Sequence, residues 1–335
     1  MKAAVLEKID NPLVIADVNL GEIKFGQVLV KINISGICGA QLQEIAGKKG
    51  NSKFVPHLLG HEGCGVVEQI GEGVTKVKPG DKVILHWKKG DGIESPFPEY
   101  FYDGKRITSG KITTLSEKSI VSENRITPVP TETPDEFCAL MGCGLSTAFG
   151  IVNYDANIKF GETVLIIGCG GVGLNIMMAC NIAGSGNIYG VDISSEKEKL
   201  IQEFGGKLVS GINQINQKID CIIDTTGNME VLSHYLPILS SRGRCIIVSQ
   251  PNEMSFIQIK NPSNFFAGNG QIIRSTQGGN VNPTEDFPRY INLYNKRKFD
   301  YKKLITHTIA LNNVNEAINL IRNGKTGRVM VNLSL

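Results

Sequence analysis

Residues 168–173 read Gly-Cys-Gly-Gly-Val-Gly, and this run constrains the fold more than any other segment of the chain. It follows an apolar segment, ETVLIIG, and leads into residues 172–184, which are typical of an apolar helix. A G-x-G-x-x-G turn between a strand and a helix indicates a dinucleotide-binding unit. We expect Gly168 to permit the tight turn, Gly170 to let the backbone approach a pyrophosphate, and Gly173 to let helix and strand pack closely. Gly171 and Val172 complete the turn.

An acidic residue follows this turn in the position that the motif requires. Asp192 ends the next apolar segment, NIYGVDI, and can accept hydrogen bonds from the hydroxyls of an adenosine ribose. A carboxylate there repels a 2′-phosphate, and the residues that follow are Ile-Ser-Ser rather than an arginine. NAD is therefore favoured over NADP. The alternative is a glycine-rich structural turn with an unrelated acid after it.

The pattern of expected strands, helices and turns changes near residue 145. Before it, short alternating or apolar runs separated by Gly, Pro and Asn predict a β-rich, barrel-like domain. After it, strand-like and helix-like segments alternate with short connections, which is typical of a doubly wound parallel sheet. We predict an α/β chain with one domain formed by residues 1–147 and 275–335 and a dinucleotide-binding domain at 148–274.

Charge and hydropathy exclude several classes of partner. The net charge of +3 is spread without a basic stripe, so we expect no nucleic-acid partner. Residues 163–184 are almost uncharged and about as long as a membrane span, but four glycines in one turn favour a buried strand, turn and helix. The N-terminus lacks a signal-peptide pattern, and the eight cysteines form no dense framework. We expect a cytoplasmic protein with reduced thiols and no membrane partner.

Three side chains form a candidate metal site. Cys38 lies in GICGA, His61 in GHEGCG and Cys143 in GCGLST, each beside glycines where a turn is expected. Three such ligands would leave a fourth zinc position open for substrate, as a catalytic site needs. Spacing alone does not establish a site, because a single cysteine is most often a small buried side chain and a single histidine is often only hydrogen-bonded.

The chain resembles the zinc-containing medium-chain dehydrogenases, the alcohol and polyol dehydrogenase family. The motifs run in family order: GICG (36–39), GHE (60–62), KPGDKV (78–83), GCGLST (142–147), GCGGVG (168–173), LITH (304–307) and the closing GRVMV. The resemblance implies a Rossmann domain beside a GroES-like catalytic domain. It implies hydride transfer between NAD and the hydroxyl of a small-molecule alcohol, polyol or sugar derivative, with zinc held by Cys38, His61 and Cys143.

The resemblance also assigns roles to further residues. Glu62 sits behind the metal and can exchange with water as a ligand. Thr147 and Val172 pack the nicotinamide, Lys197 reaches the ribose, and Arg328 reaches the pyrophosphate. Family members self-associate, so we expect a homodimer or homotetramer, formed through strands near 268–276.

The chain departs from the family pattern around the metal. Residues 88–110 contain no cysteine where many relatives hold a structural zinc, so we predict one catalytic zinc per chain and no structural zinc. Ala40 and Gln43 stand where relatives place a proton relay, and neither can pass a proton. Gln41 replaces an acid that orients the metal site. Glu44 is a candidate substitute acid, or else a solvated surface carboxylate.

The expected substrate pocket is also unusual. Trp87 falls where relatives place an aromatic side chain, and Ala40 and Gln43 belong to the same pocket. Thr108 and Ser109 replace bulky apolar residues, which suits a polyol or sugar derivative. Alternatively the loop is remodelled and neither hydroxyl faces the site.

Two rival functions remain open at the level of sequence. The missing relay fits a non-redox or transient-redox enzyme, such as an epimerase or lyase, that retains NAD. A catalytically silent NAD-binding protein is the other. The exact substrate, the physiological direction and the number of subunits lie beyond the sequence.

Overall fold

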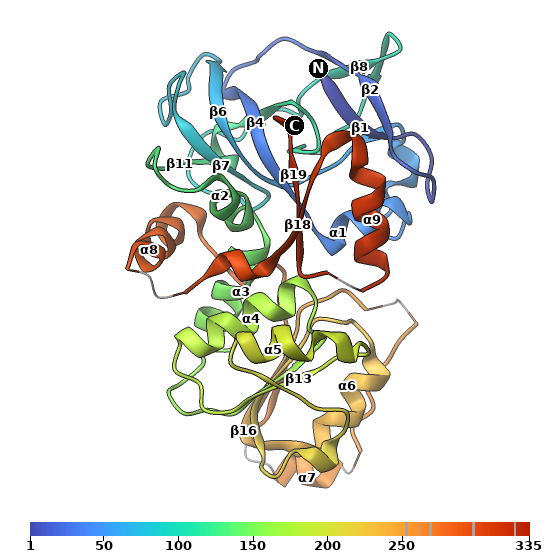
Figure 1. Cartoon of the computed structure of the whole chain (residues 1–335), viewed down its shortest axis with the longest axis vertical. Helices are drawn as coiled ribbons and strands as arrows, with labels where there is room; N and C mark the ends of the chain where they lie inside the picture. Colours follow the sequence, from blue (N-terminus) through green and yellow to red (C-terminus); the bar gives the residue numbers. More distant parts are fainter. Residues whose placement is uncertain (252–253, 261, 268–269, 297–298, 325) are drawn as a thin grey trace. The chain divides into compact units, whose positions relative to one another are not determined.

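The chain folds into two compact units in a computed structural model that describes residues 1–251, 254–260, 262–267, 270–296, 299–324 and 326–335 (Figure 1). The β-rich unit comprises Met1–Gly144 and Asn282–Leu335, and the parallel-sheet unit comprises Leu145–Val281. These boundaries fall a few residues before 147 and a few residues after 274, where the sequence pattern placed them.

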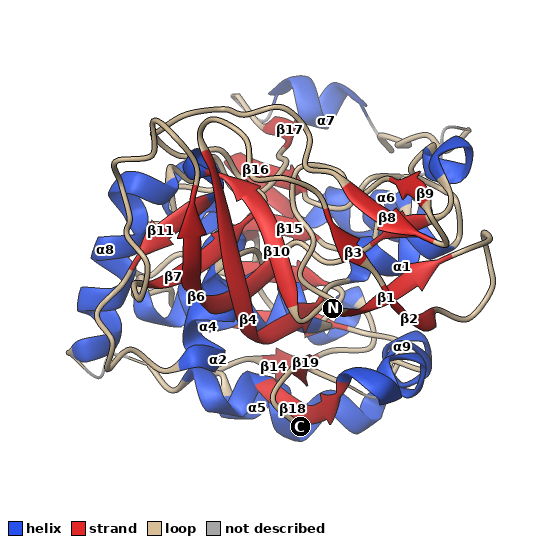
Figure 2. Cartoon of the chain, turned by 90° about the horizontal axis from the view of Figure 1, so that it is seen from above, coloured by secondary structure: helices blue, strands red, loops and turns tan. Residues whose placement is uncertain are grey.

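A seven-stranded sheet dominates the β-rich unit (Figure 2). Its order is β11-β7-β6-β4-β19-β18, with β10 also paired to β4, and every pair is antiparallel except β18 with β19. The strands are β4 (Gln27–Ile37), β6 (Glu62–Ile70), β7 (Lys82–His86), β10 (Lys118–Ser122), β11 (Ile126–Pro128), β18 (Ile305–Ala310) and β19 (Arg328–Asn332). Val329 pairs with Ile37, so the start of β19 meets the end of β4.

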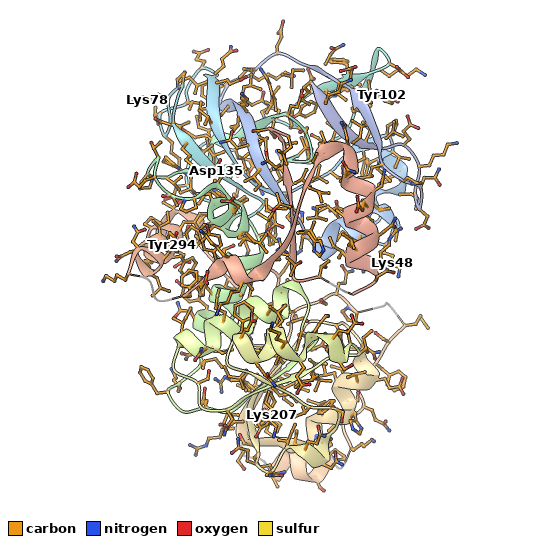
Figure 3. All side chains as sticks on the ribbon, in the orientation of Figure 1. Lys48, Lys78, Tyr102, Asp135, Lys207 and Tyr294 are labelled. Carbon is orange, nitrogen blue, oxygen red and sulfur yellow. The ribbon has the colours of Figure 1, made fainter. Side chains whose placement is uncertain are left out.

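Among the described residues, two small sheets and several α-helices complete the β-rich unit. The sheets are β2-β1-β5 and β3-β8-β9, formed by β1 (Lys2–Leu6), β2 (Val14–Asp17), β3 (Asn19–Leu20), β5 (His57–Leu58), β8 (Tyr100–Tyr102) and β9 (Lys105–Ile107). The helices are α1 (Gly39–Ile45), α2 (Asp135–Met141), α8 (Pro283–Asn295) and α9 (Val314–Arg322). Ile45 of α1 shares a buried core with Val314 and Ile318 of α9. Tyr294 of α8, which is labelled in Figure 3, stacks on Phe137 of α2 with ring centroids 4.5 Å apart.

The parallel-sheet unit has the topology of a Rossmann fold. Its six strands are β12 (Val164–Ile167), β13 (Ile188–Val191), β14 (Lys207–Leu208), β15 (Ile219–Asp224), β16 (Leu239–Ile247) and β17 (Ile272–Ser275). All pairs are parallel, in the order β14-β13-β12-β15-β16-β17. Counted along the sheet this is 3-2-1-4-5-6, the order of doubly wound dinucleotide-binding sheets. The prediction of an α/β chain with such a sheet is confirmed.

The α-helices of this unit lie before and between its strands. They are α3 (Gly144–Gly150), α4 (Gly171–Ile182), α5 (Glu198–Glu203), α6 (Met229–Tyr235) and α7 (Pro262–Ala267), with a π-helical turn at Ile151–Asp155. Residues 163–184 form β12, the glycine turn and α4, and the apolar side chains Leu174, Ile176 and Met177 of α4 are fully buried.

In the part of the chain that the structure describes, no single helix has the length and apolar composition needed to cross a membrane. One bent pair, Asp135–Met141 with Gly144–Asp155, passes this test by length and composition only.

Candidate metal centre and dinucleotide turn

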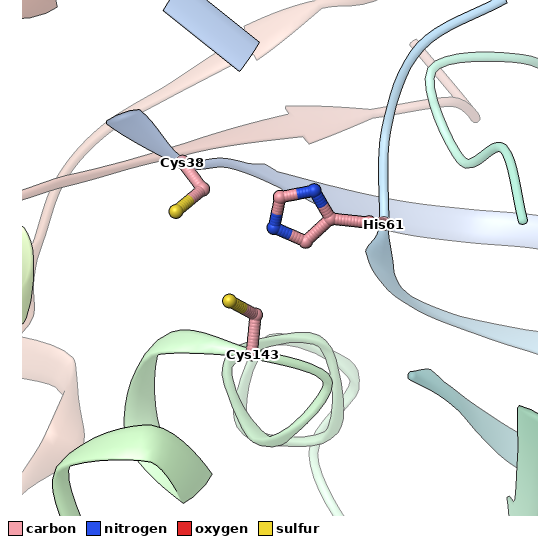
Figure 4. A group of neighbouring side chains, drawn as sticks. All are labelled: Cys38, His61 and Cys143. Carbon is pink, nitrogen blue, oxygen red and sulfur yellow. The ribbon is translucent and has the colours of Figure 1, made fainter. Parts of the chain in front are cut away.

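Cys38, His61 and Cys143 converge in the β-rich unit although they are far apart in sequence (Figure 4). Cys38 follows β4 and caps α1, His61 lies in the turn between β5 and β6, and Cys143 lies between α2 and α3. Their ligand atoms all lie within 4.8 Å of one another. Cys38 and Cys143 are buried, and the structure contains them as free thiols.

This donor set fits a zinc ion. Two sulfurs bound to one tetrahedral zinc, each about 2.3 Å from it, lie about 3.8 Å apart, which a cluster of this size can reach with small side-chain movements. Two thiolates and an imidazole leave the fourth position open, as in catalytic rather than structural zinc sites. Over the described ranges, no other three His, Cys, Asp or Glu side chains converge so closely.

A glycine with a left-handed backbone positions His61. Gly60 has φ +102°, and a Cβ at this position would lie 2.6 Å from the backbone nitrogen of Leu115. Only glycine therefore allows the turn to lie against residues 114–115. This contact fixes where the chain enters β6, and so it fixes His61 and Glu62.

Glu62 lies beside the three ligands and is completely buried. Its Oε1 forms an ion pair with Arg328, which is 2% exposed, and its Oε2 accepts a hydrogen bond from the Gly144 backbone N–H at 3.1 Å. Burial raises the pKa of Glu62, although the charge of Arg328 opposes this. A Cβ at Gly36 would lie 2.5 Å from the Glu62 carboxylate, and one at Gly142 would lie 2.8 Å from the Glu62 Cα.

Arg328 has a partner that the sequence did not identify. The resemblance assigned it to the pyrophosphate, and the structure pairs its guanidinium with Glu62 through the register of β19 on β4. Burial alone would lower the pKa of Arg328, but the charge of Glu62 outweighs this and raises it. The guanidinium therefore stays charged beside the Glu62 carboxylate. The proposed contact with a pyrophosphate stays a prediction.

The Cys38 and Cys143 thiols shift each other's pKa in opposite directions. A hydrogen bond with Cys143 lowers the pKa of the Cys38 thiol, and the neighbouring His61 and Arg328 lower it further against the effect of burial. The pKa of Cys143 is raised by the same contact and by burial. The thiolate form that metal ligation needs is therefore favoured at Cys38 first.

Gln41 links two of the three candidate ligands. Its side chain is buried in the first turn of α1, and its Oε1 accepts a hydrogen bond from the Cys38 backbone N–H at 2.8 Å. Its Nε2 contacts Nδ1 of His61. An uncharged amide therefore contacts both Cys38 and His61, and its predicted role in orienting the metal site stays a prediction.

The other predicted residues of α1 are less constrained. Ala40 is half-buried, and Gln43 is exposed. Glu44 has a side chain that is 21% exposed, and it lies 3.7 Å from the Lys49 Nζ. Burial raises the pKa of Glu44, which the charges of His61 and Lys49 partly offset.

The predicted pocket residues already have partners within the β-rich unit. The Thr108 hydroxyl is 2.7 Å from Nδ1 of His57 and donates to the Phe54 carbonyl at 2.8 Å. The Ser109 hydroxyl is buried and donates to the Gly110 carbonyl. Trp87 is half-buried just after β7. Their role in substrate binding stays a prediction.

The glycine turn in the parallel-sheet unit has the geometry expected of a phosphate cradle. Gly168 has φ +89°, which favours glycine. A Cβ at Gly173 would lie 1.9 Å from the Gly168 carbonyl oxygen, so this position admits only glycine. At Gly170, by contrast, a Cβ would meet no atom within 4 Å. No protein atom therefore blocks the approach to the backbone at Gly170, where α4 begins, and the predicted pyrophosphate contact there stays a prediction.

Asp192 lies beside this turn and is held by three donors. Its Oδ2 accepts from the Cys169 backbone N–H at 2.8 Å and from the Lys197 Nζ at 3.0 Å, and its Oδ1 accepts from the Ser194 backbone N–H at 3.0 Å. A carboxylate offers about four acceptor positions, so one remains for a ribose hydroxyl. In the same unit Thr147 is buried on α3, and Val172 is half-buried at the start of α4.

The cysteine-free segment at 88–110 is held by glutamates. Glu94 lies 3.1 Å from both Lys89 and Lys111 and 3.7 Å from Arg125. Partial burial raises the pKa of Glu94, but hydrogen bonds from Lys111, Asn124 and Lys89 outweigh this and lower it to about 2. Sequence reasoning missed this role, since charged residues in a loop carry no signal for it.

Glu123 anchors the same segment by accepting hydrogen bonds from backbone N–H groups. It is buried and accepts hydrogen bonds from the backbone N–H groups of Thr75, Lys76 and Ile93.

Comparisons with known proteins identify the family. Residues 24–131 match the model of the alcohol dehydrogenase GroES-like domain, and residues 171–296 match that of the zinc-binding dehydrogenases. Alcohol dehydrogenase 6 of Peromyscus maniculatus is 31% identical over 98% of this chain and 97% of its own. The chain belongs to the zinc-type medium-chain alcohol dehydrogenase family. As a member of that family it is an alcohol-dehydrogenase-type oxidoreductase, and the β-rich unit is its GroES-like domain.

Solved structures of medium-chain dehydrogenases share the fold. An alcohol dehydrogenase zinc-binding domain protein from Burkholderia ambifaria superposes with a TM-score of 0.89 at 24% identity, covering 99% of this chain and 98% of that one. Benzyl alcohol dehydrogenase from Acinetobacter calcoaceticus gives 0.88 at 21% identity with the same coverage. At these identities the likeness describes the fold alone.

Proposed function

We propose that this medium-chain dehydrogenase transfers a hydride between NAD and the hydroxyl of an alcohol, polyol or sugar derivative, with one catalytic zinc held by Cys38, His61 and Cys143. The convergence of these three ligand atoms within 4.8 Å is the observation that carries the proposal. If the protein bound no metal, nothing else would account for two thiols and an imidazole that meet beside a buried ion pair.

Charged side chains around the three proposed ligands set the electrostatic environment of the zinc centre. When bound, zinc supplies Lewis acidity toward the substrate oxygen. Cys38 and Cys143 provide thiolates, and the open fourth position admits the substrate. Glu62 stands next to the ligands with Arg328 as its counter-ion, so its carboxylate adds little net charge to the centre.

The glycine turn and Asp192 supply the cofactor site. NAD accepts the hydride when bound, and the protein contributes position and electrostatics. The open approach above Gly170 receives the pyrophosphate, Asp192 and Lys197 receive the ribose, and Thr147 and Val172 pack the nicotinamide. The negative charge of Asp192 favours NAD over NADP.

The proton must leave by a route that avoids Ala40 and Gln43, which cannot pass one. Glu44 is the acidic residue of α1, the helix that Cys38 caps, and burial raises the pKa of its carboxyl group. We therefore assign it, or water, as the acceptor. The preference for polyols and sugar derivatives rests on Thr108 and Ser109.

We also propose a cytoplasmic homodimer or homotetramer, with no nucleic-acid or membrane partner. β17 is the outer strand of its sheet and offers unpaired backbone groups to a second copy. Residues 268–269 of the predicted contact region lie outside the described residues. Light scattering after size-exclusion chromatography measures the subunit number.

One screen tests the function. Alcohols, polyols and sugar derivatives are supplied with NAD or NADP, reduced cofactor is read at 340 nm, and metal is counted per chain. We expect net NADH release and one zinc. Cys143→Ala should lose both zinc and turnover, while Cys180→Ala, which removes a buried thiol of the parallel-sheet unit, should keep both.

The same screen separates the rival functions. Product formation without net NADH release would indicate the transient-redox alternative. A metal-free protein with no turnover on any substrate would indicate a silent NAD-binding protein, and either result rejects the proposal.

A further inference from the structure

Gln41 faces two of the proposed zinc ligands through opposite corners of one amide. Its Oε1 accepts from the Cys38 backbone N–H at 2.8 Å, and its Nε2 contacts Nδ1 of His61. The other ring nitrogen of His61 points toward the sulfurs of Cys38 and Cys143 (Figure 4). Gln41 is 1% exposed, so water does not compete for these contacts.

Zinc ligation fixes the hydrogens at this contact. A histidine that binds metal through Nε2 carries its proton on Nδ1, which is then a donor and needs an acceptor. The Cys38 backbone N–H is a second donor at the other corner of the same side chain. An amide has an acceptor oxygen at one corner and an NH₂ donor at the other. Whichever way the amide is turned, one of the two N–H groups faces another donor.

We propose that Gln41 is a positioning residue that weakens the hold of the centre on its zinc and makes the metal exchangeable. The inference rests on the proposed function, because it requires zinc on His61. The imidazole N–H is the more polarised donor once the ring binds a cation, so the amide oxygen turns to His61 on loading. The Cys38 N–H then loses its acceptor. A carboxylate at residue 41 has two acceptor oxygens and satisfies both donors.

The test compares zinc affinity in two variants of one helix. Gln41→Glu supplies the second acceptor, and Gln43→Glu adds the same charge two residues further along α1. Zinc dissociation constants are measured by competition with a chelator of known affinity. Because loss of such an orienting contact costs about 10–100-fold in metal affinity, Q41E should bind zinc about 10–100-fold more tightly than the wild type. Q43E should change the constant less than about threefold.

A second readout uses the wild type itself. Hydrogen exchange at the Cys38 amide should become faster when zinc binds, whereas ordinary stiffening of a loaded site would make it slower. In Q41E, zinc should slow the same exchange. This measurement keeps the inference testable should Q41E fail to fold.

The outcomes are distinct. Equal tightening by Q41E and Q43E, or an affinity of Q41E within about twofold of the wild type, overturns the role of Gln41 while zinc binding itself stands. Slower exchange at Cys38 in the loaded wild type overturns it as well. If neither the wild type nor Q41E binds zinc, the proposed function is what fails.

Discussion

Arg328 and Glu62 form an ion pair that solvent scarcely reaches, with side-chain exposures of 3% and 0%. The two residues are contributed by β19 and β6, strands that flank β4 on opposite sides. Their contact joins the end of the chain to the turn that carries His61.

Removing one partner of this pair should destabilise the protein strongly. Arg328→Met leaves a buried carboxylate without a counter-ion, and we expect a loss of about 3–5 kcal/mol in the free energy of unfolding. Urea unfolding in the presence of a chelator measures this without a contribution from metal. As a control, Lys2→Met breaks the exposed pair of Lys2 with Asp17 and should cost less than about 1 kcal/mol. Equal losses in both variants would contradict the prediction.

Two glycines of the cofactor turn should respond differently to the same added methyl group. Gly173→Ala places a Cβ against the Gly168 carbonyl and should destabilise the fold by about 3 kcal/mol or more. Gly170→Ala meets no protein atom, so thermal stability should stay near that of the wild type. It should still raise the KM for NAD about tenfold or more, because the methyl occupies the approach of the pyrophosphate. Unchanged cofactor kinetics in Gly170→Ala would reject this placement.

Asp192→Asn should change the KM values for NAD and NADP in opposite directions. Loss of a hydrogen bond to a charged acceptor should raise the KM for NAD about 10–100-fold. Loss of the negative charge should lower the KM for NADP. Initial rates with each cofactor provide the measurement. If the substitution only loosened the turn that Asp192 holds through Cys169 and Ser194, both values would rise.

His86 should make stability depend on pH. It is fully buried, and this burial lowers its pKa from 6.5 to about 3. A lowered pKa means that the neutral ring is the stable form, so its contribution is complete above pH 6.5 and is lost as the pH falls toward 3. Stability should fall by about 2 kcal/mol between pH 6.5 and about pH 5. The asparagine variant, His86→Asn, should show a flatter profile in the same unfolding measurements.

The stability that Glu94 contributes through its ion pairs should be lost at acid pH. Its pKa is lowered to about 2, so its stabilisation is complete above the unfolded value near 4.5 and disappears as the pH falls toward 2. Since the side chain is 30% exposed, solvent screening limits the effect, and Glu94→Gln should cost about 1 kcal/mol at neutral pH. The difference between variant and wild type should vanish near pH 2. A difference that persists there would argue against an ionic contribution.

The sequence predicted those features that depend on neighbours along the chain. The roles of Gly168 and Gly173 followed from a turn between a strand and a helix, and the structure has that turn. The strand and helix alternation after residue 145 likewise predicted the parallel sheet. Local spacing and periodicity were sufficient in both cases, because the glycine turn lies within one βαβ unit and the alternation repeats such units along the chain.

Features that depend on distant contacts were beyond the sequence. Cys38, His61 and Cys143 meet only because three separate turns converge, and family resemblance rather than spacing suggested them. The partner of Arg328 depends on the register of β19, and the fit of Glu62 depends on Gly36. The hydrogen-bonding of Thr108 to His57 equally required the fold.

The register of β19 on β4 has a consequence during protein synthesis. Glu62 is translated before its counter-ion Arg328, which lies 266 residues further along the chain. During synthesis the carboxylate therefore has no counter-ion until those residues have been made. The centre can assume its final electrostatic state only after β19 has paired with β4.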